Sequence, residues 1–116
     1  MLKAFAMRDG NLGDAQVGTL FYNNETQTFS MQISPHIPKE KLALSLDILV
    51  TRFGQNLNHQ QVLLWIKGRI CPPSRQNIRE ILKAHGLTKY DEFELLCLTL
   101  GRCGKDEVYL EENVDT

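Results

Sequence analysis

The chain has 116 residues, 42% of them hydrophobic and 23% charged, and its formal net charge is −1. A chain of this length can bury a core without disulfides or metal. The balanced charge excludes a general electrostatic preference for nucleic acid or anionic membranes, and no apolar run approaches the length of a membrane span. We therefore expect one domain over residues 1–112, a disordered tail over 113–116, and no association with a membrane.

Cysteine usage indicates a reducing compartment. The chain has three cysteines, which form no Cys-x-x-Cys pair, so neither a disulfide framework nor a zinc ribbon is expected. The N-terminus lacks a basic segment followed by a long apolar run, and therefore no signal peptide is predicted. We expect a cytoplasmic protein with no metal and no cofactor.

The N-terminal third has the pattern of a small antiparallel sheet. Residues 2–8 suit a first strand. Residues 17–22 and 26–33 are rich in β-branched and aromatic side chains, and they flank a polar turn, which is a hairpin pattern. Gly18 lies inside the second of these strands, and it indicates a bulge or a close backbone approach.

Residues 42–53 fit two structures. The apolar side chains of Leu42, Leu44, Leu46, Ile48 and Val50 alternate along the chain, which is strand periodicity. Leucine is also a good helix former, so the same segment could be a helix. We expect extended structure at its start and helix towards Phe53, and the choice between strand and helix stays open.

A helix is predicted over residues 59–67. Asn58 suits the N-cap, and Gln61 three residues later completes a variant of the capping box. Apolar side chains over residues 62–66 lie on several faces, which is typical of a mostly buried helix. Gly68 is expected near its C-terminus.

A second helix is predicted after a proline turn. Pro72 and Pro73 prevent continuation of the first helix, and Ser74 suits the N-cap of the next. The apolar face of this helix is expected to include Ile78, Ile81, Leu82 and His85, and Gly86 is expected to end it.

A third helix and a closing strand complete the predicted fold. The helix begins after Thr88 or Asp91 and ends near Gly101, and residues 107–111 alternate as a strand does. The fold class is therefore α+β, with a small antiparallel sheet (the N-terminal hairpin plus the closing C-terminal strand) packed against about three helices.

Charge is unevenly distributed along the chain. Residues 67–89 contain six cations and one anion, whereas residues 91–116 contain eight anions and two cations. Cations four residues apart on the second predicted helix form one stripe on its surface. The residues predicted to contact a protein or nucleic acid are Arg69, Arg75, Gln76, Arg79 and Lys83.

Motifs for catalysis are absent from the sequence. It has no nucleophile elbow, phosphate loop or dinucleotide fingerprint. Asp106 and Glu107 are adjacent, so their side chains would point to opposite faces of a strand, and a solvated strand edge is the simpler interpretation. Cys97 is expected to be a small buried hydrophobe, and Cys103 an unreactive turn thiol. We predict that the chain is not an enzyme.

Residues 59–86 also have the outline of a helix-turn-helix. In that motif the N-terminal residues of the second helix meet base edges, and Arg, Gln and Asn suit this contact chemically. DNA binding is therefore an alternative function, although the proline turn and the net negative charge disfavour it.

Several short segments resemble the N-terminal subdomain of HipA-type kinases. They span residues 15–111 and comprise Val17–Leu20 with Thr28–Ser30, Leu44–Leu46, the spaced Arg69, Pro72 and Arg75, then Gly86–Leu87, Leu95–Leu96 and the closing segment Gly101–Leu110. Two features depart from the family. Asp47 occupies the place of the family's proline, and the segment from Trp65 to Arg75 is only loosely similar.

The resemblance implies a bacterial accessory module that carries no ATP site and packs against a serine/threonine kinase core. In some toxin–antitoxin systems such a module is a separate protein that restrains the kinase. Our leading hypothesis is thus a non-catalytic protein-interaction module that binds a kinase-like toxin. A phage-type inhibitor of a host enzyme is a further alternative, and the sequence predicts no oligomeric state.

Overall fold

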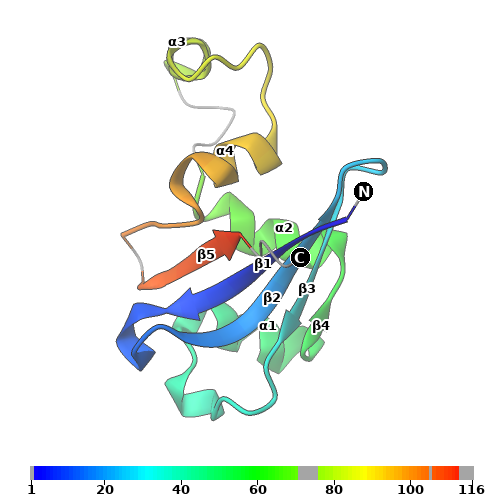
Figure 1. Cartoon of the computed structure of the whole chain (residues 1–116), viewed down its shortest axis with the longest axis vertical. Coiled ribbons are helices and arrows are strands. Elements are labelled where there is room, and N and C mark those ends of the chain that lie inside the picture. The colour runs from blue at the N-terminus through cyan, green and yellow to red at the C-terminus, as the bar shows by residue number, and fades with distance from the viewer. Residues whose placement is uncertain (1, 71–75, 105, 113–116) are drawn as a thin grey trace.

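The computed structural model describes residues 2–70, 76–104 and 106–112. Its antiparallel sheet has the strand order β4-β3-β2-β1-β5. The strands are β1 (Leu2–Asp9), β2 (Ala15–Asn23), β3 (Thr28–Ile33), β4 (Asn56–Leu57) and β5 (Val108–Glu112). The predicted α+β class, the hairpin and the closing strand are confirmed, and β5 pairs with β1 (Figure 1).

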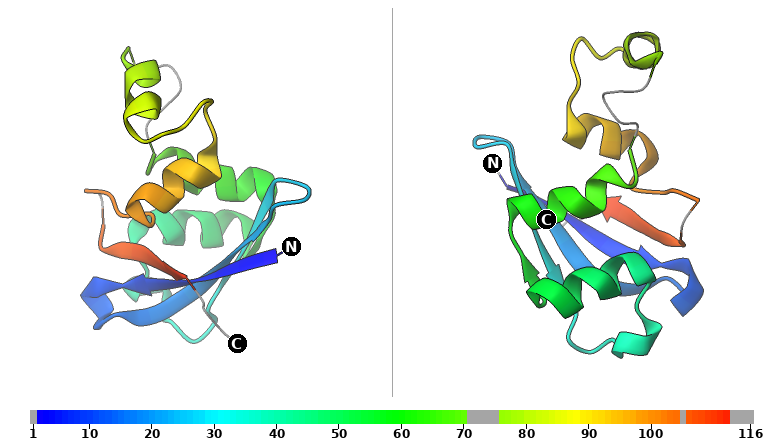
Figure 2. Two further views of the ribbon diagram at one scale, coloured as in Figure 1. Left: turned by 45° about the horizontal axis from the view of Figure 1, so that its top comes forward. Right: turned by 180° about the vertical axis from the view of Figure 1, so that it is seen from behind.

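Helices cover one face of this sheet. The α-helices in the described ranges are α1 (Leu44–Phe53), α2 (His59–Lys67), α3 (Ile78–Ala84) and α4 (Glu92–Thr99), with short 3-10 helices η1 (Gly10–Leu12) and η2 (Lys39–Lys41). Figure 2 shows α1, α2 and α4 on the same side of the sheet, while α3 stands apart from it. Over the described residues, no helix is both long and apolar enough to cross a membrane.

The core lies between the helices and the covered face of the sheet. Along β3 the buried residues Phe29, Met31 and Ile33 alternate with exposed neighbours, which places every second side chain against the helices. Apolar side chains of α1, α2 and α4 meet these strands in one cluster. On the opposite face of the sheet, Figure 2 shows no helix among the described residues.

Gly18 is required by a close backbone approach, as predicted. The register of β1 and β2 shifts between Met7 and Arg8, opposite Gly18. A Cβ atom at Gly18 would lie only 2.7 Å from the backbone oxygen of Gln32 on the neighbouring strand β3. Any side chain here would therefore force the central strands apart.

Residues 44–53 form a helix from the start, so the expected extended structure at the beginning of this segment is wrong beyond residue 43. Leu46 and Leu49 are buried, with Val50 and Phe53 packed beside them, and these four share one helical face. The alternation arose because Leu44 and Ile48, on another face, are also apolar but exposed. This helix explains why four α-helices are seen where about three were expected.

The predicted helix caps are confirmed where the structure describes them. Asn58 accepts from the backbone N–H of Gln61, and the Gln61 side chain accepts from the backbone N–H of Asn58. Asp91 caps α4 by accepting from the backbone N–H of Glu94. Both caps satisfy helix N–H groups that have no intrahelical partner. The predicted Ser74 cap and the predicted tail over 113–116 lie outside the described residues.

Replacing Asn58 by alanine is expected to lower the free energy of unfolding by about 1 kcal/mol, because the backbone N–H of Gln61 loses the side-chain oxygen that accepts its hydrogen bond. The other bond of the capping box is donated by the backbone N–H of residue 58, which alanine retains. Urea denaturation followed by circular dichroism measures the change. Gln60→Ala, at an exposed position of the same helix, is the control and should stay within about 0.5 kcal/mol of the parent. Equal effects of the two substitutions would contradict the capping role.

The second predicted helix is present as α3, but its apolar face is narrower than expected. Leu82 is buried and Ile78 and Ile81 are half-buried, whereas His85 is exposed at the C-terminal end of the helix. The expectation that His85 lies on the apolar face is therefore wrong. The helix ends at Ala84, one residue earlier than predicted, so His85 is the C-cap and does not lie on a face of the helix.

Candidate functional site

Arg69 is buried, so the expectation that it lies on the exposed contact surface is wrong. Its side chain is 2% exposed, and the guanidinium lies 4.2 Å from the centre of the Trp65 ring. Nη1 donates to the backbone oxygen of Gly101 at 2.7 Å, and Nη2 donates to Oδ1 of Asp106 at 2.6 Å. The residue therefore joins the end of α2 to the segment that leads into β5.

Asp106 is the partner of this buried cation, and the expected solvated strand edge is wrong at this position. Its side chain is 11% exposed. Its Oδ2 accepts from Ser45 Oγ at 2.8 Å, and its Oδ1 accepts from the Val108 backbone N–H at 3.0 Å. Burial by itself raises the pKa of Asp106, but the hydrogen bonds from Arg69, Ser45 and Val108 outweigh it and hold the pKa below its ordinary value.

The depressed pKa of Asp106 predicts that the ion pair loses its stabilising effect in acid. Because the folded-state pKa lies below the unfolded one, the contribution is complete above the unfolded pKa, about 3.9, and disappears as the pH falls through the folded pKa. We expect the stability difference between the parent and Asp106→Asn to be largest at neutral pH and to shrink towards about pH 3.

Urea midpoints of both proteins across this pH range test the prediction. Glu107→Gln, an adjacent exposed carboxylate, is the matched control and should show little difference from the parent at any pH. A stability difference between the parent and Asp106→Asn that does not change with pH would contradict a lowered pKa of Asp106 in the folded protein.

The other predicted contact residues lie on or before α3. Gln76, Arg79 and Lys83 are exposed, and Arg79 and Lys83 lie one turn apart on the helix. Arg75 lies outside the described residues. The structure thus brings Arg79 and Lys83 together on one surface of α3. Arg69 is not part of that surface, because its side chain is buried against Gly101 and Asp106.

The connection between α2 and α3 bears on the helix-turn-helix alternative. Residues 68–77 separate the two helices, whereas that motif joins its helices by a turn of three or four residues. The observed spacing does not favour the motif, and DNA binding stays a prediction without structural support.

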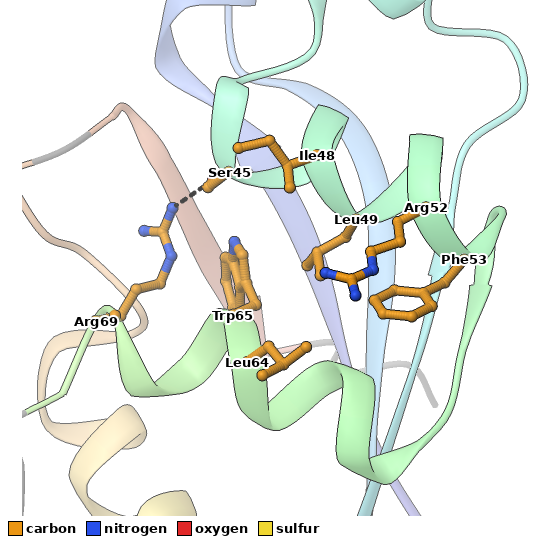
Figure 3. A pocket seen from close by; sticks show the side chains of 9 residues that line it. Ser45, Ile48, Leu49, Arg52, Phe53, Leu64, Trp65 and Arg69 are labelled. Carbon is orange, nitrogen blue, oxygen red and sulfur yellow. Dashed lines mark hydrogen bonds between the residues drawn. The ribbon is translucent and has the colours of Figure 1, made fainter.

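A groove between α1 and α2 was missed by the sequence analysis. It contains a pocket of about 250 Å³, drawn in Figure 3 and lined by Ser45, Ile48, Leu49, Arg52, Phe53, Leu64, Trp65, Gly68 and Arg69. Leu64 is 56% exposed at its edge, although the apolar pattern of residues 62–66 predicted a mostly buried helix. The only sequence signal was that α2 carries more apolar residues than one buried face needs.

Comparisons of the chain with models of protein families, with curated protein sequences and with solved structures found no match. Among residues 2–70, 76–104 and 106–112, no three His, Cys, Asp or Glu side chains gather where they could hold a metal ion.

Cys97 is expected to react slowly with thiol reagents. Burial, followed by the charge of Glu94, raises the pKa of its thiol from 9.0 to about 11. Because the thiolate is the nucleophile, modification near pH 8 should be about 100-fold slower than for an ordinary thiol. Iodoacetamide labelling read by peptide mass spectrometry measures the rate at Cys97.

The same labelling in concentrated urea is the control, because the effect requires the folded environment of Cys97. Its rate there should rise to that of an ordinary thiol. Equal rates in the folded and unfolded protein would contradict the prediction.

Proposed function

We propose that this chain is a cytoplasmic, non-catalytic protein-interaction module that contacts an acidic surface of its partner through α3. The observation that supports this proposal is the position of α3. It stands apart from the body of the molecule (Figures 1 and 2). Its residues Arg79 and Lys83 are exposed and lie one helical turn apart. A helix in this position can reach a partner without rearrangement of the sheet.

The chemistry of α3 favours an electrostatic contact. Exposed cations steer association and fix orientation, and they contribute more to the association rate than to the affinity. Gln76, exposed just before the helix, adds donor and acceptor groups beside the two cations. Binding through such a surface weakens as ionic strength rises, because exposed charges are screened.

The first partner to test is a HipA-type kinase, because the sequence resemblance suggests a module that restrains such a toxin. The alternative function, inhibition of a host enzyme by covering its active site, would use the same kind of contact. An activity assay of the recovered partner distinguishes a kinase-like toxin from another host enzyme.

Charge reversal at α3 tests the proposal. A tagged full-length chain and its Arg79→Glu/Lys83→Glu variant are recovered from the native cells at low salt, and bound proteins are quantified by mass spectrometry. The matched control is Lys39→Glu/Lys41→Glu, which makes the same charge change at exposed positions of η2, remote from α3 (Figure 1).

We expect one partner to be lost with the α3 variant and kept with the η2 variant. Equal recovery from all three proteins would overturn the role of α3. Salt-dependent binding to a promoter fragment of the chain's own operon, abolished by the α3 variant, would instead assign these cations to DNA.

A further inference from the structure

Two large apolar side chains are exposed at the groove between α1 and α2, and a third lies one helical turn before the groove on α1. Leu44 is 71% exposed, and Ile48 and Leu64 are each 56% exposed. Leu44 and Ile48 lie one turn apart on α1, and Ile48 and Leu64 line the pocket from its two sides. Single exposed leucines are ordinary, but apolar side chains gathered at one hollow mark a binding surface.

The pocket suits side chains of a partner better than a whole cofactor. Its volume of about 250 Å³ lies below the range of roughly 300–1,000 Å³ that is usual for sites that enclose small molecules. Leu49, Phe53 and Trp65 supply apolar surface, as Figure 3 shows. An inserted leucine or phenylalanine side chain would bury this surface and the exposed side chains at its edge.

Charge at the groove favours an acidic occupant. Among the described residues, two cations and no carboxylate line the pocket, and the charge of Arg69 is already paired with Asp106. Arg52 is exposed and packs over the ring of Phe53, 5.4 Å from its centre. Asp47, the acidic residue of α1, does not line the pocket and accepts a hydrogen bond from Thr51. Arg52 is therefore the cation available to a partner at this site.

The wall of the pocket also contains a buried donor without an acceptor. Trp65 is 4% exposed, and its Nε1 has no hydrogen-bond partner among the described residues. Figure 3 shows this nitrogen pointing towards α1, near Ser45 and Ile48. A buried N–H without an acceptor is unfavourable, so an occupant that displaces the exposed Ile48 side chain and brings an acceptor would gain a hydrogen bond.

We propose that the α1–α2 groove binds an amphipathic helix of a partner protein, with apolar side chains in the pocket and a carboxylate on Arg52. The groove lies between α1 and α2. A helix of the partner that packs between them would place apolar side chains in the pocket from positions i, i+3 or i+4, and i+7. A symmetric contact with a second copy is disfavoured, because it would place both Arg52 side chains on one apolar surface without a carboxylate among the lining residues. This site is independent of α3.

A displayed library of amphipathic helices of about 15 residues tests the proposal. Its apolar positions are fixed at helical spacing, its flanking positions are drawn equally from glutamate and lysine, and it contains no tryptophan. Selection uses the full chain, with counter-selection on Leu64→Asp, an exposed position at the groove. Selected peptides are then titrated while the fluorescence of Trp65 is followed, since this is the single tryptophan of the chain.

We expect the selected helices to be rich in glutamate, to shift the Trp65 emission, and to bind at least about tenfold more weakly to Arg52→Glu. Arg79→Glu/Lys83→Glu is the control and should bind them as the parent does. Absence of enrichment, enrichment in lysine, or no change in Trp65 emission would overturn the proposal. Concentration-dependent dimerisation that Leu64→Asp abolishes would also overturn it and assign the groove to a second copy.

Discussion

Replacing Arg69 by methionine is expected to lower the free energy of unfolding by about 3–5 kcal/mol. Methionine keeps much of the apolar stem against Trp65 but removes the charge. The carboxylate of Asp106 would then be left in a nearly buried position without its counter-ion, and the backbone oxygens of Gly101 and Val108 would lose a donor. Urea denaturation at neutral pH measures the loss.

A double variant distinguishes the free energy lost by leaving Asp106 without a counter-ion from the net contribution of the ion pair to stability. Arg69→Met combined with Asp106→Leu removes both charges, so the double variant should recover much of the stability lost in the single one. Arg52→Met, at an exposed arginine that pairs with no described carboxylate, is the control and should change stability by less than about 0.5 kcal/mol. A loss below about 1 kcal/mol in Arg69→Met would contradict the buried ion pair.

Local features of the fold could be predicted because their causes are local. The hairpin of β2 and β3 and the capping box of Asn58 and Gln61 depend on residues that are close in sequence. Residues 44–53 were harder, because apolar residues occupy both the buried face and an exposed one, which imitates the alternation of a strand. The helix forms because only that geometry places Leu46 and Leu49 together in the core.

Arg69 could not be placed from the sequence, because its partners are distant along the chain. Asp106 follows it by 37 residues and Ser45 precedes it by 24. Its neighbours in the sequence are cations and a proline turn, so a basic surface was the natural interpretation. Arg79 and Lys83, by contrast, lie on a short helix outside the sheet, and their predicted exposure is what the structure shows.

The buried ion pair also helps to define the groove. Through Ser45 the pair contacts α1, and through Arg69 it contacts the end of α2, so it links the two helices that form the groove. Arg69 lies at the edge of the pocket but carries a compensated charge. The groove therefore has a cation whose charge is compensated at one end, Arg69, and an exposed cation, Arg52, elsewhere on its wall.

Phe93→Ala is expected to lower the free energy of unfolding by about 3–5 kcal/mol. Phe93 is the buried aromatic anchor of α4 on the sheet. Its ring stacks on Tyr22 with centroids 3.9 Å apart and an interplanar angle of 6°, and it also meets Phe5 and Phe29. Removal of the ring leaves a cavity under α4 and abolishes these aromatic contacts, each worth roughly 0.5–1.5 kcal/mol beyond the buried area.

Denaturation and hydrogen exchange together test this anchoring role. Amides of α4 should exchange faster in Phe93→Ala than those of α1 and α2, because α4 loses its main contact with the sheet. Phe93→Leu keeps most of the volume and should cost less, and Leu98→Ala, at an exposed position of the same helix, should change stability by less than about 0.5 kcal/mol. If Leu98→Ala were as damaging as Phe93→Ala, α4 would have to be held through its outer face, and the ring cluster at Tyr22 could not be the contact that anchors it.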